Sequence, residues 1–281
     1  MTVKIVTDSG ADISAETAKE LGITIVPLYI YFGGKTYRDG IEMTPDELYK
    51  RLENDPVHPT TTQPMPYDFT GYYEKISEDA DAIVSIHVSA KASGTYNAAL
   101  QGARQSKGKC EVHVVDSSSV SVGQALITTA AARIAGAGGS LKEVLEETHR
   151  AVAQTQIRGL LDSLKYLLKG GRITKTKALI GSLLKVKPLL TMNNGEIAQT
   201  GVVRSYSKGV EKLLEFVKGY HNLQEAALSH STVPEAANTL KKGIASIIDE
   251  KRIQMSRVGA ALGVHGGPGT LLVALRGGSK Y

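Results

Sequence analysis

Positive charge is concentrated in one stretch of the sequence, residues 164–187. Seven lysines and arginines stand there, and no acidic residue occurs between Asp162 and Glu196. The formal net charge of the whole chain is only +5, so the remaining residues are slightly acidic and the basicity is local. A local positive field of this kind predicts an anionic ligand or partner.

The middle of this basic stretch places one long cationic side chain after two glycines. Apolar residues at helical spacing predict a helix over residues 164–168 that ends near Gly170, in a left-handed conformation. They predict a second helix from about Lys175 to the residue before Pro188. The glycines let the backbone turn sharply, which leaves Arg172 to face a bound anion. A helical hairpin with a solvated basic face explains the same pattern about equally well.

Hydroxyl side chains gather in a proline-rich segment. Residues 60–63 read Thr-Thr-Thr-Gln and lie between prolines, which fix extended backbone. This segment, with Thr61 and Thr62 at its centre, is suited to presenting hydrogen-bond donors to a ligand. An extended linker that leads into a helix over residues 67–76 is nearly as good an interpretation.

A second polar segment follows the apolar strand that we predict over residues 82–88. Ser93 and Gly94 lie before the helix predicted over residues 98–105. A serine hydroxyl and unpaired backbone N–H groups at a helix N-terminus, aided by the helix dipole, can bind an anion. Serine is also an ordinary N-cap residue, so a purely structural role accounts for the same sequence.

His265 stands in a glycine-rich run near the end of the chain. Four glycines and Pro268 lie within residues 263–269. We therefore expect a loop that leaves the imidazole exposed to an approaching ligand, although a lone histidine is more often structural. Together with Arg172 and the hydroxyl groups it forms a polar set that suits a carboxylate or a phosphate. This set lacks an obvious nucleophile with its base.

Composition and missing motifs argue against several function classes. Twelve Tyr, three Phe and no Trp form a poor stacking platform for single-stranded nucleic acid, so we expect no nucleic-acid partner. The single cysteine, Cys110, has no second thiol, and the sequence motifs of zinc hydrolases, serine hydrolases and dinucleotide-binding folds are absent. We expect neither a metal nor a cofactor. No run of eighteen apolar residues occurs and a strand begins at the N-terminus, so a cytoplasmic location is expected.

The order of predicted elements indicates an α/β protein with two lobes. A strand over residues 3–6, followed by a polar turn and a helix, is how a parallel α/β sheet begins. The turn Asn193-Asn194-Gly195 joins two later strands and is a strong hairpin signal, which predicts a mixed or antiparallel sheet with helices. We place an N-terminal, Rossmann-like parallel α/β sandwich at residues 1–155 and a second α/β lobe at residues 156–281.

Five motifs, in order along nearly the whole chain, resemble the DegV family of bacterial fatty-acid-binding proteins. The motifs are Thr7-Asp8-Ser9, Thr61-Thr62-Gln63-Pro64, Ser93-Gly94-Thr95-Tyr96, Lys169-Gly170-Gly171-Arg172-Ile173 and His265-Gly266-Gly267-Pro268-Gly269. No single motif is diagnostic, but the five together are specific. One departure is Thr62, which stands where the family commonly has serine and whose methyl group narrows the head-group end.

The resemblance implies that one long-chain fatty acid is enclosed between the lobes, with its head group at loops of residues 1–155 and its acyl chain in a slot of residues 156–281. It also implies the residues that bind the carboxylate, which are Thr61, Thr62, Ser93, Gly94, Arg172 and His265. In this family a separate ATP-dependent kinase subunit phosphorylates the carboxylate for phospholipid synthesis. The protein itself is then a lipid-binding subunit without catalytic residues.

The basic stretch is expected to serve a partner of this kind. Lys169, Lys175 and Lys177 would dock the kinase subunit or contact acidic phospholipid at the membrane surface. Two other classes stay open: an autonomous phosphotransferase or hydrolase that acts on a small anion, and a basic nucleic-acid-binding regulator. The enzyme would need no partner, and the regulator would bind nucleic acid with a steep dependence on salt.

Overall fold

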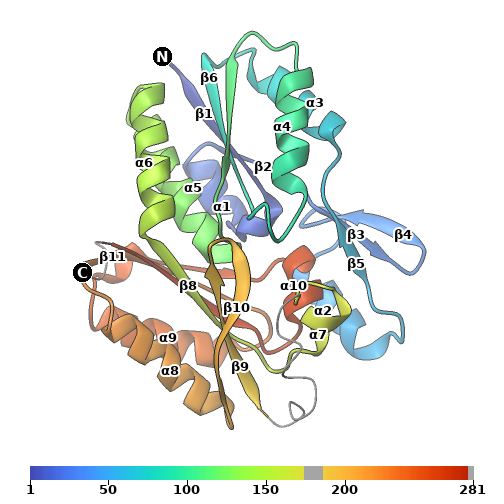
Figure 1. The fold of residues 1–281 in the computed structure, drawn as a ribbon, viewed down its shortest axis with the longest axis vertical. Coiled ribbons are helices and arrows are strands. Elements are labelled where there is room, and N and C mark those ends of the chain that lie inside the picture. Colours follow the sequence, from blue (N-terminus) through green and yellow to red (C-terminus); the bar gives the residue numbers. More distant parts are fainter. Residues whose placement is uncertain (174–185, 278–281) are drawn as a thin grey trace.

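The computed structural model describes residues 1–173 and 186–277, which form three β-sheets with helices between and around them. A parallel sheet lies at one end of the molecule, a larger mixed sheet at the other, and a small sheet at the side (Figure 1). The predicted α/β fold, parallel in its first half and mixed in its second, is confirmed by this topology.

The first sheet contains four strands, all of them parallel. In spatial order the strands are β2 (Ile23–Val26), β1 (Val3–Asp8), β6 (Ala82–His87) and β7 (Glu111–Asp116). Every residue of β6 is buried, as is typical of a parallel strand that helices cover on each side.

Helices cover both faces of this sheet. They are α1 (Ala15–Glu20), α3 (Pro66–Ile76), α4 (Thr95–Gln105), α5 (Ser121–Gly136) and α6 (Leu141–Gln154). Ile5 of β1 packs in the core that includes α5 and α6, whereas its neighbour Val6 packs in the core that includes α3 and α4. Successive side chains of a strand point to opposite faces, so the apolar run of β1 serves both layers.

The second sheet contains six strands, of which only β11 and β12 pair in parallel. In spatial order the strands are β10 (Glu196–Val203), β9 (Lys187–Asn193), β8 (Thr155–Leu160), β13 (Leu271–Gly277), β11 (Leu223–His230) and β12 (Ile253–Arg257). The predicted hairpin at Asn194 joins β9 and β10. No strand is predicted from the sequence over residues 155–160, yet β8 lies there between β9 and β13.

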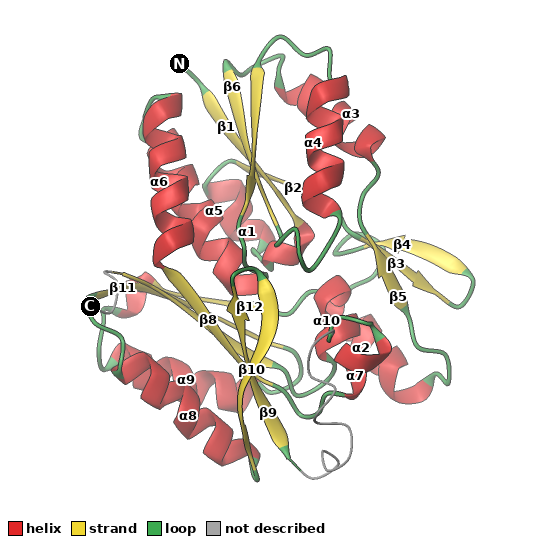
Figure 2. Cartoon of the chain, in the orientation of Figure 1, coloured by secondary structure: helices red, strands yellow, loops and turns green. Residues whose placement is uncertain are grey.

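Helix α5 connects the two large sheets. The helices α8 (Tyr206–Lys218) and α9 (Pro234–Ala245) cover one face of the second sheet, and α5 lies against the other face (Figure 2). Ile127 of α5 packs in the core of the first sheet, whereas Val122 and Leu126 pack against the second. Residues 121–132 are all buried, because α5 has apolar neighbours on every side.

A small antiparallel sheet lies beside the two large ones. Its strands are, in spatial order, β4 (Lys35–Arg38), β3 (Tyr29–Phe32) and β5 (Thr60–Thr62). Two helices, α2 (Pro45–Asn54) and α10 (Ala260–Gly266), share a core with β3, in which Leu48 from α2 meets Val264 from α10. A helix near the end of the chain is therefore held by segments from its beginning.

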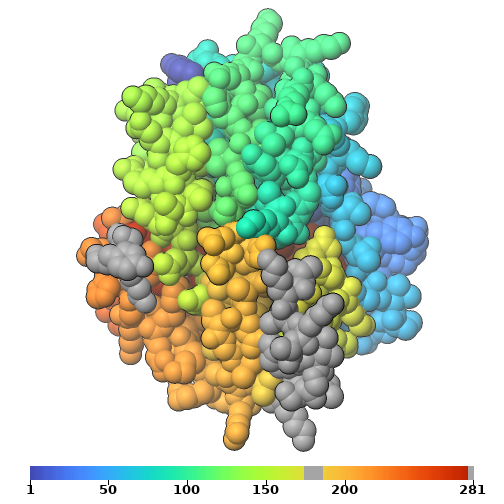
Figure 3. Space-filling model, viewed as in Figure 1, coloured from blue at the N-terminus to red at the C-terminus, as the bar shows by residue number. Residues whose placement is uncertain are grey.

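The remaining helical pieces are short: η1 (Ser9–Ala11), α7 (Lys165–Lys169) and η4 (Glu250–Arg252). In the space-filling view, the green atoms of the first half of the chain meet the orange atoms of β9 and β10 along a transverse seam (Figure 3). Among the described residues, no helix combines the length and the apolar composition needed to cross a membrane. The division into domains at residue 155 stays a prediction.

Gly102 of α4 lies against α3 with no room for a side chain. A Cβ atom at Gly102 would lie 2.6 Å from the Cβ of Phe69 and 2.7 Å from the carbonyl oxygen of Pro66. We expect Gly102→Ala to lower the free energy of unfolding by about 2 kcal/mol, because the two helices must separate. Equilibrium denaturation in urea measures this value.

Gly71 of α3 provides a matched control. It is exposed, and a Cβ atom there would meet nothing within 4 Å. Gly71→Ala is expected to raise the free energy of unfolding by roughly 0.5–1 kcal/mol, because alanine loses less backbone entropy than glycine. Similar effects of the two substitutions would contradict the close packing of α3 and α4.

Candidate functional site

A cavity of about 130 Å³ lies where the second sheet faces α7, α10 and the start of α5. Its wall is mainly apolar, and β8, β9 and β13 supply much of it. Six apolar residues from these strands and their neighbours are Ile157, Leu161, Leu190, Met192, Ile197 and Leu272. A wall of this composition suits a hydrocarbon group, with specificity left to a few polar groups.

Polar side chains enter the same cavity from four segments that are far apart in the sequence. Five of the predicted site residues line it: Thr61, Thr62, Ser93, Arg172 and His265. The sixth, Gly94, is not part of the wall and stands directly beside Ser93. The structure therefore brings the five side chains to one cavity, while their role in binding a carboxylate stays a prediction.

His265 connects two of these segments, since its Nε2 lies 2.7 Å from the Oγ1 of Thr61 in β5. The expected exposed loop is wrong, because residue 265 belongs to α10 and its side chain is partly buried. The helix forms in spite of its glycines because Val264 packs against α2. One of the glycines is required for this contact, since a Cβ atom at Gly263 would lie 2.7 Å from the side chain of Leu48.

The imidazole of His265 is neutral at pH 7. Burial, followed by the charges of Arg172 and His58, lowers the pKa of His265 to about 3. Among the described residues, its buried Nδ1 has no hydrogen-bond partner. Since an unpaired buried N–H is rarer than an unpaired acceptor, we assign the proton to Nε2, which donates to Thr61. The Thr61 hydroxyl can then donate its own proton to a ligand.

Arg172 brings a cationic group next to this pair. Its Nη1 donates to the carbonyl oxygen of Gly170 at 2.8 Å, and within residues 1–173 and 186–277 it forms no ion pair. A Cβ atom at Gly170 would collide with the ring of His265, so this glycine is needed for the close approach. The left-handed residue is Gly171, with φ of 67°, rather than Gly170 as predicted. The second helix predicted from Lys175 lies outside the described residues.

Ser93 lies beside Thr95 at the start of α4, and its neighbour Gly94 lies close to Gln63, the residue that follows β5. The Oγ of Ser93 lies 2.8 Å from the Oγ1 of Thr95 and accepts a hydrogen bond from the backbone N–H of Thr95 at 3.3 Å. Gly94, rather than Ser93, is the N-cap of α4, and a Cβ atom there would lie 3.1 Å from the side-chain amide of Gln63. Gln63 also lines the cavity and is not among the predicted site residues. Its place directly after Thr62 is the signal that could have identified it.

Of the three predicted docking lysines the structure describes only Lys169, and it is not part of the cavity wall. Lys169 is exposed at the end of α7. Lys175 and Lys177 lie outside the described residues. Docking through these three residues stays a prediction.

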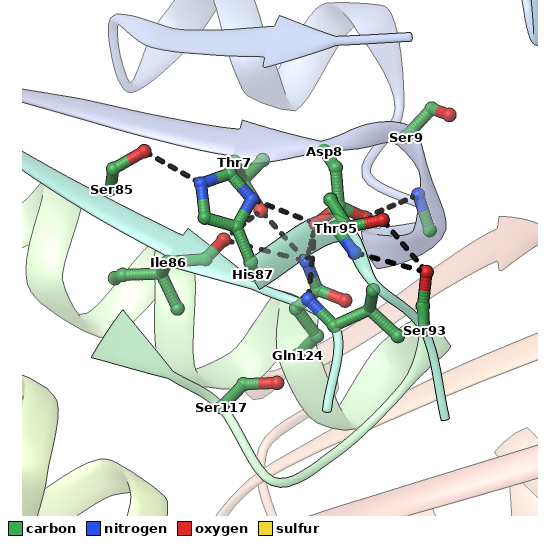
Figure 4. A network of polar contacts seen from close by, with 12 residues as sticks. Thr7, Asp8, Ser9, Ser85, Ile86, His87, Ser93, Thr95, Ser117 and Gln124 are labelled. Atoms are coloured by element: carbon green, nitrogen blue, oxygen red, sulfur yellow. Dashed lines mark hydrogen bonds and ion pairs between the residues drawn. The ribbon is translucent and has the colours of Figure 1, made fainter. Parts of the chain in front are cut away.

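Buried polar side chains form a chain of contacts beneath the loop that precedes α4 (Figure 4). The Oδ2 of Asp8 lies 2.9 Å from the Nδ1 of His87, whose Nε2 lies 2.7 Å from the Oγ of Ser85. The order resembles the triad of serine hydrolases, but all three residues are completely buried and none lines the cavity. Asp8 also accepts a hydrogen bond from the backbone N–H of Val88 at 3.0 Å. These buried hydrogen bonds therefore support the loop rather than offering a nucleophile to substrate.

Comparisons with known proteins agree along the whole length of the chain. A family model described as an uncharacterised protein of the DegV family matches residues 2–276. A DegV domain-containing protein from Caldanaerobacter subterraneus subsp. tengcongensis is 34% identical over 271 residues, which are 95% of each protein.

Two solved structures share the fold. A fatty-acid-binding DegV family protein from Thermus thermophilus superposes with a TM-score of 0.90 at 32% identity, covering 99% of this chain and 100% of the other. A stearic-acid-binding protein from Eubacterium ventriosum superposes with a TM-score of 0.86 at 27% identity, covering 98% of each chain.

The low pKa of His265 has a measurable consequence for stability. Between pH 6.5 and about 3 the unfolded chain binds a proton at this ring and the folded chain does not, so stability falls as the pH decreases through this range. We expect His265→Gln to reduce this loss by at most about 1.4 kcal/mol per pH unit. Urea denaturation at pH 7.5, 6, 5 and 4 measures the difference.

His149→Gln is the control, since His149 is an exposed histidine of α6. This substitution should leave the acid dependence of the wild type nearly unchanged. Parallel acid profiles for His265→Gln and the wild type would show that His265 is not held neutral in the folded protein.

Proposed function

The chain belongs to the DegV family, and from this premise we propose that it binds one long-chain fatty acid and presents the carboxylate to a separate ATP-dependent kinase subunit. The observation that carries the proposal is a single cavity with an apolar wall into which Thr61, Thr62, Ser93, Arg172 and His265 also project. The fatty-acid-binding proteins of the same fold from Thermus thermophilus and Eubacterium ventriosum support it.

The proposed roles follow from the chemistry of each group. Arg172 supplies the positive charge for the carboxylate, and the hydroxyls of Thr61, Thr62 and Ser93 donate hydrogen bonds. His265 stays neutral and orients the Thr61 hydroxyl through its Nε2. Thr62 keeps the hydroxyl that a serine would supply, and its methyl group narrows the head-group end.

Affinity and selectivity have different sources in this proposal. Burial of about fourteen methylene groups contributes roughly 11 kcal/mol before the costs of association. Each charge-assisted hydrogen bond at the head group contributes only about 1.5–3 kcal/mol. The apolar wall therefore sets how tightly the lipid binds, and the polar residues determine which end of it is held.

The position of the polar residues is compatible with transfer to a partner. Thr62 and Gln63 line the cavity and are exposed, so the polar residues reach the molecular surface. The Nε2 of His265, which carries the ring proton, cannot act as a base for the Thr61 hydroxyl, and the group formed by Asp8, His87 and Ser85 is completely buried. We therefore assign phosphorylation of the carboxylate to the partner, which would dock near Lys169, Lys175 and Lys177.

Replacement of the head-group cation tests the binding site. Arg172→Gln is expected to weaken fatty-acid binding about tenfold, because one charge-assisted hydrogen bond is lost. Displacement of a fluorescent fatty acid by palmitate measures the affinity. Lys169→Gln, which removes an exposed positive charge three residues away, should leave the affinity unchanged. Equal losses for both variants would contradict a direct role of Arg172.

Charge reversal tests the docking of the kinase. The double variant Lys175→Glu/Lys177→Glu should bind palmitate like the wild type and yet lower the rate of acyl-phosphate formation with kinase and ATP at least fivefold. The control is Lys218→Glu/Lys242→Glu, which changes the same number of charges on exposed positions of α8 and α9. Unchanged turnover in the first variant would rule out docking through this stretch. Acyl phosphate made from ATP by the purified protein alone would instead favour an autonomous enzyme.

A further inference from the structure

The first turn of α10 is held by the side chains of two aspartates from the beginning of the chain. The backbone N–H of Gly259, the N-cap, donates to the Oδ1 of Asp12 at 2.8 Å. The N–H of Ala261 donates to the Oδ1 of Asp39 at 3.2 Å. Gly259 has no side chain to cap the helix, so these two aspartates take over that task.

Each carboxylate is itself fixed through its second oxygen. The Oδ2 of Asp39 accepts a hydrogen bond from the Oγ of Ser9 at 2.7 Å. The Oδ2 of Asp12 is hydrogen-bonded to the Oγ of Ser121. This Oγ also lies 2.9 Å from the Oγ of Ser229 in the second sheet. Asp12 therefore connects η1, the first residue of α5, β11 and α10, which come from all parts of the chain.

Backbone strain marks the same place. Asp12 and Ser121 both have left-handed conformations, with φ of 52° and 49°. Such conformations are unfavourable for residues other than glycine and persist where side-chain contacts fix them. The hydrogen bond between these two side chains supplies that constraint.

The first turn of α10 also separates two spaces. Val258 and Ala261 line the apolar cavity of the candidate site. Gly259 between them lines a second cleft of about 600 Å³, together with Asp12 and Asp39. A Cβ atom at Gly259 would lie 2.9 Å from the Oδ1 of Asp12, so the wall has no room for a larger residue. Movement of either carboxylate would therefore move the wall of the cavity.

We infer that Asp12 and Asp39 are positioning residues for the head-group site: they hold the first turn of α10 and thereby fix His265 against Thr61. Seven residues form α10, so its N-terminal anchor and His265 lie on one short rigid element beside α2 and α7 (Figure 1). The inference rests on the proposed function for the role of His265 in binding the head group, but the position of the His265 ring can be measured without a ligand.

The charge state of the two carboxyl groups follows from burial. Burial raises the pKa of Asp12 to about 8 and that of Asp39 to about 6, while the hydrogen bonds they accept lower both values. Near pH 7, Asp39 is therefore mainly ionised and suits the positive end of the helix, and Asp12 is mainly protonated. The other titratable or charged groups that face the pair are Asp8 of β1, Tyr49 of α2, His230 of β11 and Arg257 of β12.

The direct test is nuclear magnetic resonance of the unliganded chain with ¹⁵N-labelled histidine, in which His265→Gln assigns the His265 signals. Asp39→Asn, which removes the negative charge, and Asp12→Ala, which removes both oxygens, are expected to shift the Nε2 signal, because loss of the anchor changes the hydrogen bond to Thr61. Asp46→Asn is the control: Asp46 is an exposed aspartate near the same cleft that pairs with Arg257 and does not bond to α10.

A pH titration of the wild type adds a test that needs no substitution at the carboxylates. The Nε2 signal should change with a midpoint near pH 6 as Asp39 gains a proton, although the ring itself stays neutral there. The titration is repeated in His58→Gln, since His58 also faces His265. An unchanged Nε2 signal between pH 7.5 and 5, or a signal in Asp39→Asn that matches the wild type, overturns the inference.

Binding measurements separate this inference from the proposed function. Asp39→Asn should weaken palmitate binding about fivefold at pH 7.5, the effect of one lost helix cap, and Asp46→Asn should not change it. A wild-type chain that binds no fatty acid contradicts the proposed function and leaves the magnetic-resonance test in force. Normal palmitate affinity in both Asp12→Ala and Asp39→Asn counts against the inference alone.

Discussion

The hydrogen bond between Thr61 and His265 is the contact on which the rest of the site depends. It joins a strand near the start of the chain to a helix near its end, 204 positions later. It can form because β3, α2 and α10 share one core and β5 pairs with β3, which brings β5 next to α10. Burial keeps the ring neutral, so the pair offers a directed hydroxyl while Arg172 supplies the positive charge.

The apolar wall of the cavity has a separate origin. Residues 121–132 of helix α5 are all buried and pack against one face of each large sheet, so the two sheets share a common layer. The strands β8, β9 and β13 turn apolar residues into the space that remains beside α7 and α10. Hydrophobic burial is non-directional and scales with area, whereas hydrogen bonds require fixed geometry. The apolar wall therefore suits the burial of an acyl chain, and the anchored polar residues suit the directed hydrogen bonds to a carboxylate.

Local sequence patterns predicted most elements of the fold and the side chains of the polar set, but not how the set is held. The hairpin at Asn194 and the buried strand β6 have strong local signals. Strand β8 has none, because its six residues include Arg158 and Gly159 and are defined by their partners β9 and β13. Helix α10 was missed because its glycines favour a loop and only packing against α2 overrides them. The roles of Asp12 and Asp39 were missed because an aspartate that caps a helix more than 200 residues away leaves no local sequence pattern.

The central claim, that the cavity holds one fatty acid, is tested most directly by analysing what the protein carries. The purified protein is denatured and extracted with organic solvent, and the extract is quantified by mass spectrometry. About one long-chain fatty acid per chain is the expected result, and its length would show which acyl chain fits the cavity. No extractable lipid, together with an unchanged melting temperature when palmitate is added, would contradict fatty-acid binding.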